Sequence, residues 1–365
     1  MALPVSGLEC DFTLALNNRT GKFFFCKELI DESDDLIKTV RYWRLPLAKL
    51  PEGLFARILG RLGMLEVALR FEHPLSYRFL PTISRSRPVV FTDPRECLLY
   101  AVKPRDVVLC HDMGPITHPD LYAAGVHELY TAAFARIAAA KPLMLFVSEA
   151  SRLAFISLYG DNFPLLQVIH IPLRHEMEEG DMEPVAGLPD RFLLTVGSIG
   201  LRKNQLRCVE AFALSGLAKQ GHGYVLCGGR EPGYDAAVAA AQSTPGVTLT
   251  GYVNDSQLRW LYRHAEGFVL PSLLEGFGLP AAEAIRNGLI PLVGSGGALH
   301  EVTGDAAILV DPLRSEEIAT GMRQLTEMDE SERNRRLIDL REHISSFSRE
   351  NMLGSWRSAL KAALA

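Results

Sequence analysis

The second half of the chain alternates short apolar runs with helical patterns, and few folds accept that order. Five apolar runs are bounded by turn residues: 191–198, 223–229, 247–253, 267–272 and 289–295. Runs of this kind are typical of strands covered on both faces, and strands that alternate with helices favour a parallel sheet. The pattern therefore predicts a doubly wound α/β domain, which binds ligands beyond the carboxyl ends of its strands.

The first half shows a weaker form of the same alternation. Apolar runs at 11–17, 88–93 and 106–112 end in polar or turn residues, and a helical pattern over 130–141 precedes a further run at 143–149. A chain of 365 residues is long enough for two domains of roughly 100 to 200 residues each. We therefore expect a second α/β domain in this half.

The boundary between the two domains is predicted from a change in composition. The segment 176–191 is acidic and holds two prolines and two glycines, which is typical of a linker. We expect one domain over 1–185, a second over 186–347, and a C-terminal helix over 348–365 that could return to the N-terminal domain.

Composition excludes several classes of protein. The net charge of -5 and the isoelectric point near 6.1 argue against nucleic acid as a partner. The six cysteines form no C-x-x-C pair and no cluster with histidines, which argues against a zinc site and against disulfides. A reducing cytoplasm fits this pattern best. The N-terminus lacks the features of a secretory signal, and no run of about 18 apolar residues could span a bilayer. Composition does not predict an oligomeric state.

Two glutamates lie in the otherwise apolar string LPSLLEGFGLPAAEAIRNGL. Glu275 lies on a loop that follows a predicted strand, and Glu283 lies in the first turns of a helix that Pro280 begins and Gly288 ends. The backbone amides of 276–278 precede this helix and are suited to an anion. The two carboxylates could then accept hydrogen bonds from sugar hydroxyls. The alternative is that Glu283 is favoured only by the helix dipole and that Glu275 is solvated.

A basic pair follows the predicted strand at 191–198. Arg202 and Lys203 precede a helix that Asn204 could cap, so two cations and free backbone amides would converge there. This arrangement favours a phosphate or diphosphate site over a solvated basic turn. The spacing differs from the G-x-x-x-x-G-K-[ST] loop, which disfavours hydrolysis of ATP or GTP.

In the first half, His111 and Asp112 end a predicted strand. His111 could donate to a substrate hydroxyl or to a backbone carbonyl, with Asp112 orienting the imidazole, or it could be a satisfied histidine in a turn. We interpret His118 as structural.

Three segments resemble the C-terminal half of the retaining glycosyltransferases of family 4, which have the GT-B fold. They are TVGSIGLRKNQ, GYVNDSQLRWLYRHAEGFVLPSLLEGFGLPAAEAIRNGLIPLVG and GGALHEVTGDAAILVDP. Two glutamates separated by seven residues are the signature of that family. The segments CHDMGPITHPDLY and LFVSEASRLAF resemble the N-terminal parts of bacterial mannosyltransferase-like members. The resemblance implies two Rossmann-like doubly wound domains that face each other across a cleft, the first for the acceptor and the second for a nucleotide sugar.

The resemblance also implies an activity. We expect a metal-independent, retaining transfer of a hexose, with mannose from GDP-mannose as the first choice, to a glycan or lipid-linked saccharide in surface polysaccharide synthesis. The nucleotide sugar is a co-substrate, and no cofactor or metal is expected. The enzyme would be cytoplasmic, with peripheral contact at the inner membrane face as an option. Alternatives are a nucleotide-sugar epimerase, another GT-B transferase, or a catalytically silent binding subunit of a polysaccharide assembly. A Rossmann dehydrogenase is disfavoured because no G-x-G-x-x-G motif opens a helix after a strand.

Site residues follow from the same resemblance. Lys203 would hold the donor diphosphate, Glu275 would lie at the donor sugar, and Glu283 would bind the ribose. The predicted catalytic residues are His111, Lys203 and Glu275. The predicted donor-binding residues are Ser198, Arg202, Lys203, Val253, Glu275, Gly276, Phe277, Gly278, Leu279 and Glu283. The predicted acceptor-side residues are Gly21, Lys22 and Asp112. Many relatives carry arginine or threonine where Ser198 stands, and a glycine-rich loop followed by arginine where this chain has Gly21 and Lys22.

The segment 41–87 is rich in arginine among apolar residues. It could be an interfacial segment that brings the enzyme to a lipid-linked acceptor, or an ordinary helical excursion packed on the sheet. Pro46, Pro51 and Pro74 favour the second interpretation because they would interrupt a long amphipathic face.

Overall fold

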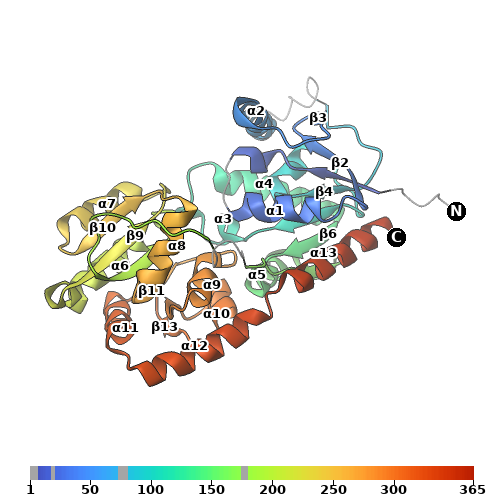
Figure 1. Cartoon of the computed structure of the whole chain (residues 1–365). Coiled ribbons are helices and arrows are strands. Elements are labelled where there is room, and N and C mark those ends of the chain that lie inside the picture. The colour runs from blue at the N-terminus through green and yellow to red at the C-terminus, as the bar shows by residue number, and fades with distance from the viewer. Residues whose placement is uncertain (1–6, 18–20, 73–80, 174–179) are drawn as a thin grey trace. The chain divides into compact units, whose positions relative to one another are not determined.

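The computed structural model describes residues 7–17, 21–72, 81–173 and 180–365 (Figure 1). Contacts divide the chain into two compact units. The first holds Met1–Pro172 and Arg349–Ala365, and the second holds Leu173–Ser348. Residues 176–179 of the expected linker lie outside the described residues.

The first domain boundary therefore lies earlier in the chain than the predicted one at 185. Residues that were assigned to the first domain contact the second unit instead. The backbone carbonyl of Asp181 accepts two hydrogen bonds from Arg259, and Glu183 accepts from Asn254 and Gln257. These contacts fasten the segment to helix α8 (Asp255–His264).

The N-terminal unit is built on a seven-stranded sheet of order β3-β2-β1-β4-β5-β6-β7. All its strand pairs are parallel except the pair of β2 with β3. The strands are β1 (Leu8–Asp11), β2 (Ile37–Tyr42), β3 (Leu45–Pro46), β4 (Val89–Phe91), β5 (Val107–Cys110), β6 (Leu143–Phe146) and β7 (Leu166–Val168). The helices are α1 (Gly21–Asp31), α2 (Gly53–Glu72), α3 (Gly114–Thr117), α4 (Val126–Ala140), α5 (Glu149–Tyr159) and α13 (Arg349–Leu364), with short helices η1 (Leu14–Asn17), η3 (Pro94–Leu99) and η4 (Pro119–Leu121).

The prediction of a strand over 11–17 is wrong. The strand β1 ends at Asp11, and η1 follows. The carboxylate of Asp11 accepts the backbone N–H of Thr13 at 2.9 Å, which turns the chain. Leu14 and Leu16 are buried on the short helix, so the apolar run marks burial without marking a strand.

The C-terminal unit is built on a six-stranded, fully parallel sheet of order β10-β9-β8-β11-β12-β13. The strands are β8 (Arg191–Val196), β9 (His222–Cys227), β10 (Val247–Gly251), β11 (Gly267–Leu270), β12 (Pro291–Gly294) and β13 (Ile308–Val310). Besides α8, the helices are α6 (Gln205–Ser215), η6 (Leu217–Gln220), α7 (Tyr234–Ser243), α9 (Leu279–Arg286), α10 (Gly297–Thr303), α11 (Ser315–Glu327) and α12 (Glu330–Ser345). This arrangement confirms the predicted doubly wound α/β architecture.

Strand order locates the place in each sheet where a ligand would bind. In the C-terminal unit the chain moves outward from β8 to β9 and β10, and then crosses to β11 on the other side of β8. In the N-terminal unit the same reversal lies between β1 and β4. Doubly wound sheets bind ligands at the carboxyl ends of the strands where the order reverses.

The C-terminal helix α13 packs on the N-terminal unit. The indole N–H of Trp356 donates to the carbonyl of Leu29 at 3.1 Å and to the hydroxyl of Ser33 at 2.9 Å. Arg349 forms ion pairs with Glu28 and Glu32. The last helix of the chain therefore belongs to the unit that the chain begins with. None of the helices in the described ranges is both long and apolar enough to cross a bilayer.

Gly228 lets the loops after β8 and β9 approach each other. A Cβ atom on Gly228 would lie 1.9 Å from the carbonyl oxygen of Gly197, whereas a Cβ on Gly229 would meet nothing within 4 Å. The chain therefore needs glycine at 228 to bring these two strand ends together.

We expect Gly228→Ala to lower the free energy of unfolding of the C-terminal unit by at least about 2 kcal/mol, because a methyl group would force two backbones apart. Gly229→Ala is the matched control and should change it by less than about 0.5 kcal/mol. Urea denaturation followed by circular dichroism measures both. Equal midpoints for the two variants would contradict the close approach.

Candidate functional site

A buried ion pair joins the strand ends where the sheet of the C-terminal unit reverses. Lys203 follows β8, and its ammonium contacts the carboxylate of Glu275, which follows β11. Ser272 donates to the same carboxylate at 2.8 Å, and the guanidinium of Arg202 lies 3.3 Å from its other oxygen. Arg202 also pairs with Glu231 at 2.9 Å. Two cations that were predicted to hold a diphosphate thus contact one of the predicted glutamates.

The electrostatics of this pair follow from burial and charge. Burial raises the pKa of Glu275, but the charges of Lys203 and Arg202 and the hydrogen bonds from Lys203 and Ser272 outweigh it, so its pKa lies below the ordinary value. Burial lowers the pKa of Lys203, and the charge of Glu275 offsets part of that effect. The carboxylate of Glu275 is therefore ionised at neutral pH, and it contacts the buried side chain of Lys203.

The backbone around the pair is held by Asn204. This residue has a left-handed conformation with φ of 64°, and its side-chain amide donates to the carbonyls of Pro271 at 3.0 Å and Pro312 at 2.7 Å. The backbone N–H of Leu273 donates to the carbonyl of Arg202 at 2.9 Å. Asn204 therefore does not cap α6 with its side chain, as the sequence suggested, because it ties the loops after β8, β11 and β13 together.

The N-terminus of α9 lies directly after Glu275. Gly278 has φ of 103°, and a Cβ there would lie 2.7 Å from the side chain of Leu299, so glycine is required. Phe277 is buried and packs edge-on against Phe347, with ring centroids 5.5 Å apart. Within the described part of the chain, the amides of Gly276, Gly278 and Leu279 donate to no protein oxygen. A helix N-terminus whose backbone N–H groups have no protein acceptor is suited to binding an anion.

Glu283 lies deeper in the unit than Glu275. It is buried in α9, and its carboxylate accepts a hydrogen bond from the hydroxyl of Tyr262 at 3.2 Å. The described contacts therefore join Arg202 and Lys203 to Glu275, whereas Glu283 contacts α8.

The remaining donor-side predictions lie on loops at the same edge of the sheet. The carbonyl of Ser198 accepts from the side chain of Gln205 at 3.0 Å, so Ser198 is fixed through its backbone. Val253 is half-buried in the loop after β10, next to Tyr252, whose side chain is largely exposed. Neither the side chain of Ser198 nor that of Val253 forms a hydrogen bond with Lys203 or Glu275 in the described structure.

In the N-terminal unit, His111 follows β5. Its Nε2 lies 3.0 Å from the carbonyl of Thr92, and because a carbonyl only accepts, Nε2 carries the proton. Burial, followed by the charge of Lys22, lowers the pKa of His111 to about 3. The imidazole is therefore neutral at pH 7, with its Nε2–H already donated to the backbone.

Asp112 does not orient His111, which corrects that prediction. Its carboxylate accepts the backbone N–H of Gly114 at 2.9 Å and the hydroxyl of Tyr122 at 3.2 Å. Asp112 therefore shapes the start of α3.

A second ion cluster lies where the N-terminal sheet reverses, and sequence reasoning found only one of its members. Lys22, the second residue of α1 after Gly21, pairs with buried Asp93, which follows β4. Arg95 donates to the same carboxylate at 2.9 and 2.8 Å and lies over the ring of Tyr130. Burial raises the pKa of Asp93, but Arg95 and Lys22 outweigh it and hold that pKa well below the ordinary value.

For two of the missed residues, Asp93 and Arg95, a signal was present in the sequence. Asp93 and Arg95 follow an apolar run that was identified as a strand, so their position at the edge of the sheet could have been inferred. No local pattern marked Ser272, Glu231 or Tyr262, because their roles depend on partners in other loops.

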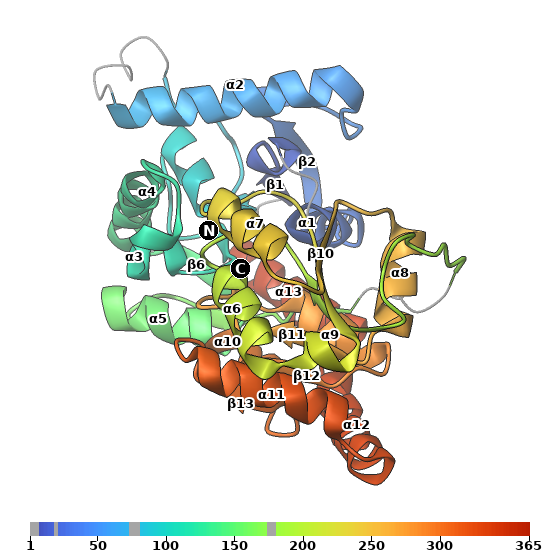
Figure 2. The same cartoon turned by 90° about the vertical axis from the view of Figure 1, so that its left-hand side faces the viewer.

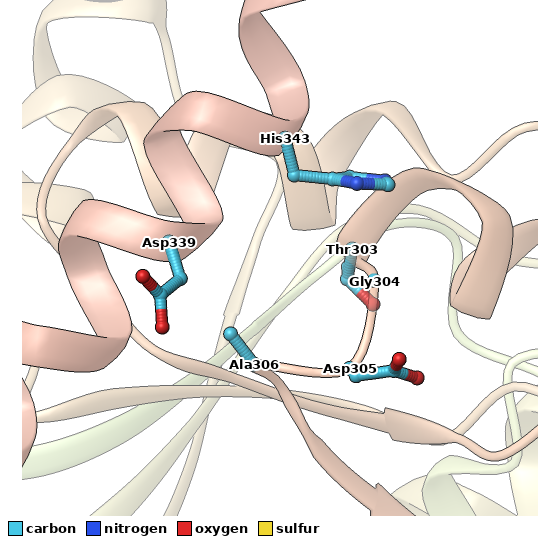
Figure 3. Close-up of a pocket in the computed structure, with 6 residues that line it drawn as sticks. All are labelled: Thr303, Gly304, Asp305, Ala306, Asp339 and His343. Carbon is cyan, nitrogen blue, oxygen red and sulfur yellow. The ribbon is translucent and has the colours of Figure 1, made fainter.

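A separate pocket of about 330 Å³ lies in the C-terminal unit (Figure 3). It is lined by Thr303, Gly304, Asp305, Ala306, Asp339 and His343. Asp339 and His343 come from α12, and the imidazole of His343 lies 2.8 Å from the carbonyl of Glu301. None of the predicted site residues lines this pocket, and its two carboxylates do not suit a diphosphate. Among the residues the structure describes, no group of side chains is arranged to hold a metal ion.

Known sequences match the C-terminal unit of this chain. Residues 181–339 match the family described as glycosyl transferases group 1. The chain is 27% identical to O-antigen chain mannosyltransferase B from Escherichia coli over 71% of this chain and 70% of that protein. It is 28% identical to the serotype-specific mannosyltransferase WbdA from Escherichia coli over 57% of this chain, but the match spans only 27% of WbdA.

Solved structures of low sequence identity share the fold. Trehalose-6-phosphate synthase OtsA has a TM-score of 0.69 at 13% identity, over 98% of this chain and 99% of that one. HepE from Anabaena, solved in complex with UDP and glucose, has a TM-score of 0.69 at 15% identity and the same coverage. Both are GT-B glycosyltransferases, so the two units of this chain have the GT-B type of fold.

We expect the imidazole of His111 to remain neutral from pH 8 down to pH 4, because its pKa in the folded chain is about 3. Long-range proton–nitrogen NMR correlation should show the Nε2–H form throughout. The unfolded chain takes up this proton near pH 6.5, so His111 costs stability as the pH falls from 6.5 toward 3. His111→Gln should therefore lose less stability in acid, with His118→Gln as the control. Titration of His111 near 6.5 would contradict this.

Proposed function

We propose that this chain, whose C-terminal unit carries a glycosyltransferase group 1 domain, is a retaining glycosyltransferase of family 4. It moves mannose from GDP-mannose to a glycan or lipid-linked saccharide in surface polysaccharide synthesis. The observation that carries the proposal is the contact of Lys203 and Arg202 with Glu275. This contact lies beside the start of α9, where backbone N–H groups have no protein acceptor among the described residues. The mannosyltransferase relatives favour mannose as the sugar.

Binding of the donor follows from the charges at this site. The diphosphate lies against the ammonium of Lys203, the guanidinium of Arg202 and the amides of 276–279, which together form a pocket for an anion. Glu275 is already ionised and accepts hydrogen bonds from hydroxyls of the donor sugar. Glu283 binds the ribose, which requires its carboxylate to exchange the contact with Tyr262 for a ribose hydroxyl. The base lies near the backbone of Tyr252 and Val253.

The chemical step depends on stabilising the leaving group. As the bond from the anomeric carbon to the phosphate oxygen breaks, negative charge builds on the diphosphate, and Lys203, Arg202 and the helix amides stabilise that charge. The acceptor oxygen attacks from the same face, and its proton passes to the departing phosphate oxygen, so the anomeric configuration is retained. Two cations and the helix N-terminus supply the positive charge, and the reaction therefore needs no metal ion.

The N-terminal unit receives the acceptor at the edge where β1 and β4 end. His111 contacts the transferred sugar, and its neutral state leaves Nδ1 to accept a hydrogen bond from a sugar hydroxyl. Gly21 and Lys22 lie on the acceptor side, where Lys22 is held by Asp93.

We expect Lys203→Ala and Glu275→Ala each to lower kcat by about a hundredfold or more, because each removes a group that acts on the donor. Lys219→Ala changes an exposed lysine of the same unit and is the control, with unchanged turnover. Near-normal turnover in both site variants, with the fold intact by circular dichroism, would overturn the site assignment.

A panel of nucleotide sugars tests the donor and the reaction class. At one hundred times its dissociation constant, GDP-mannose should stabilise the protein by about 2.7 kcal/mol, and UDP-glucose should stabilise it less. NMR of the product should show the α-anomer, and EDTA should leave the rate unchanged. Stabilisation without transfer to any acceptor would indicate a silent binding subunit. The absence of stabilisation by any nucleotide sugar would overturn the proposed function.

A further inference from the structure

The helix α2 forms an outer element of the N-terminal unit (Figure 2). It runs from Gly53 to Glu72 without a break, so Pro51 precedes the helix and does not interrupt it. The helix packs on η1, η3 and α4. This corrects the expectation that prolines in the segment 41–87 break any long face. Pro74 lies outside the described residues.

The inner face of α2 holds small residues, two apolar side chains and an ion pair; its buried residues are Ala56, Leu59, Gly60, Gly63, Glu66, Val67 and Arg70. Gly60 and Gly63 lie against η1 and the turn before it, and a Cβ on Gly63 would come 2.2 Å from the side chain of Thr13. Further along the helix, buried Glu66 binds Arg70 on the same face. The close approach of the backbone leaves no room for a side chain at Gly60 and Gly63.

Glu66 is also fixed from outside the helix. Arg44 donates to its carboxylate at 3.0 and 2.6 Å, and the indole of Trp43 donates at 2.7 Å. The charged pair therefore points into the unit and not toward solvent.

The outer face of α2 carries four large apolar side chains. Leu54, Phe55, Ile58 and Leu65 are 73%, 49%, 45% and 55% exposed. A surface helix normally turns its large apolar residues inward and its charges outward. The helix α2 departs from that pattern, because it buries the Glu66–Arg70 pair beside Leu59 and Val67 and also exposes four large apolar side chains. Such a face is suited to an apolar environment outside the protein.

The charges beside this apolar face have one sign. Arg57 and Arg61 are exposed between Leu54 and Leu65, and no acidic residue lies in that interval. The exposed acidic residues Glu52 and Glu72 lie at the two ends of the helix. This local positive charge contrasts with the net charge of -5 for the whole chain.

We propose that α2 lies in the plane of an anionic lipid bilayer. Its apolar face enters the boundary between headgroups and acyl chains, and Arg57 and Arg61 bind lipid phosphates. A second copy of this chain is a poorer occupant, because facing helices would bring the arginines of both copies together with no acidic residue between them. Lipid binding by α2 goes beyond the proposed function, since it requires neither the donor nor the acceptor.

Vesicle flotation with the full chain tests this proposal. We expect the protein to float with vesicles of phosphatidylcholine that contain roughly 30% phosphatidylglycerol. With vesicles of phosphatidylcholine alone, it should stay at the bottom of the gradient. Phe55→Ser combined with Ile58→Ser should abolish flotation. Leu153→Ser combined with Leu158→Ser, which changes comparably exposed leucines of α5, is the matched control and should float like the unchanged chain.

The arginines are tested in the same assay. Arg57→Gln should weaken binding roughly fivefold, and adding Arg61→Gln should weaken it by a similar factor again. Arg335→Gln changes an exposed arginine of α12 and should have no effect. Circular dichroism of each variant checks folding.

Three outcomes would overturn the proposal. The unchanged chain could fail to float with anionic vesicles, or the α2 and α5 variants could lose flotation equally. In the third outcome, flotation would be absent and size-exclusion chromatography would show a dimer that the Phe55→Ser variant does not form. That result would assign the outer face of α2 to contact with a second copy of the chain. Because the vesicles contain no sugar acceptor, failure here leaves the proposed transferase activity intact, and failure of that activity leaves lipid binding by α2 intact.

Discussion

The reversal of strand order in the C-terminal sheet is the constraint on which the candidate site depends. The strands β8 and β11 are neighbours at that reversal, where doubly wound sheets bind ligands at the carboxyl ends of their strands. The loops that follow these two strands bring Lys203 and Glu275 into contact. The glycine contact between 197 and 228 and the side-chain amide of Asn204 hold the surrounding loops in place.

An ion pair in this position is poorly explained by stability. Removing two charges from water is costly, and well-packed apolar residues in their place are often as stable or more so. The pair is therefore better explained by the ligand groups that can replace each of its partners. Under the proposed function, a diphosphate takes the place of the carboxylate against Lys203 and Arg202, and sugar hydroxyls take the place of the cations against Glu275. The pair would then hold its groups desolvated and oriented for the donor.

The N-terminal unit repeats the same design with different residues. Lys22, Asp93 and Arg95 meet where β1 and β4 end, and His111 follows the next strand. Sequence reasoning found Lys22 and His111 because of their place in motifs. It missed Asp93 and Arg95, although they directly follow a strand that it identified, and it assigned Asp112 to His111 on adjacency alone. Neighbours in sequence at a strand end point in different directions, so adjacency is a poor guide to contact.

The sequence by itself determined the doubly wound architecture, the positions of most strands in the second half, and the residue types at the candidate site. These features rest on local periodicity and on turn residues, which are visible in one dimension. Tertiary structure alone decided that Lys203 contacts Glu275, that Glu283 contacts Tyr262, and that α2 buries Glu66 with Arg70. Each of these depends on which segments distant in sequence become neighbours, and burial and close backbone approach decide that only when the whole chain has folded.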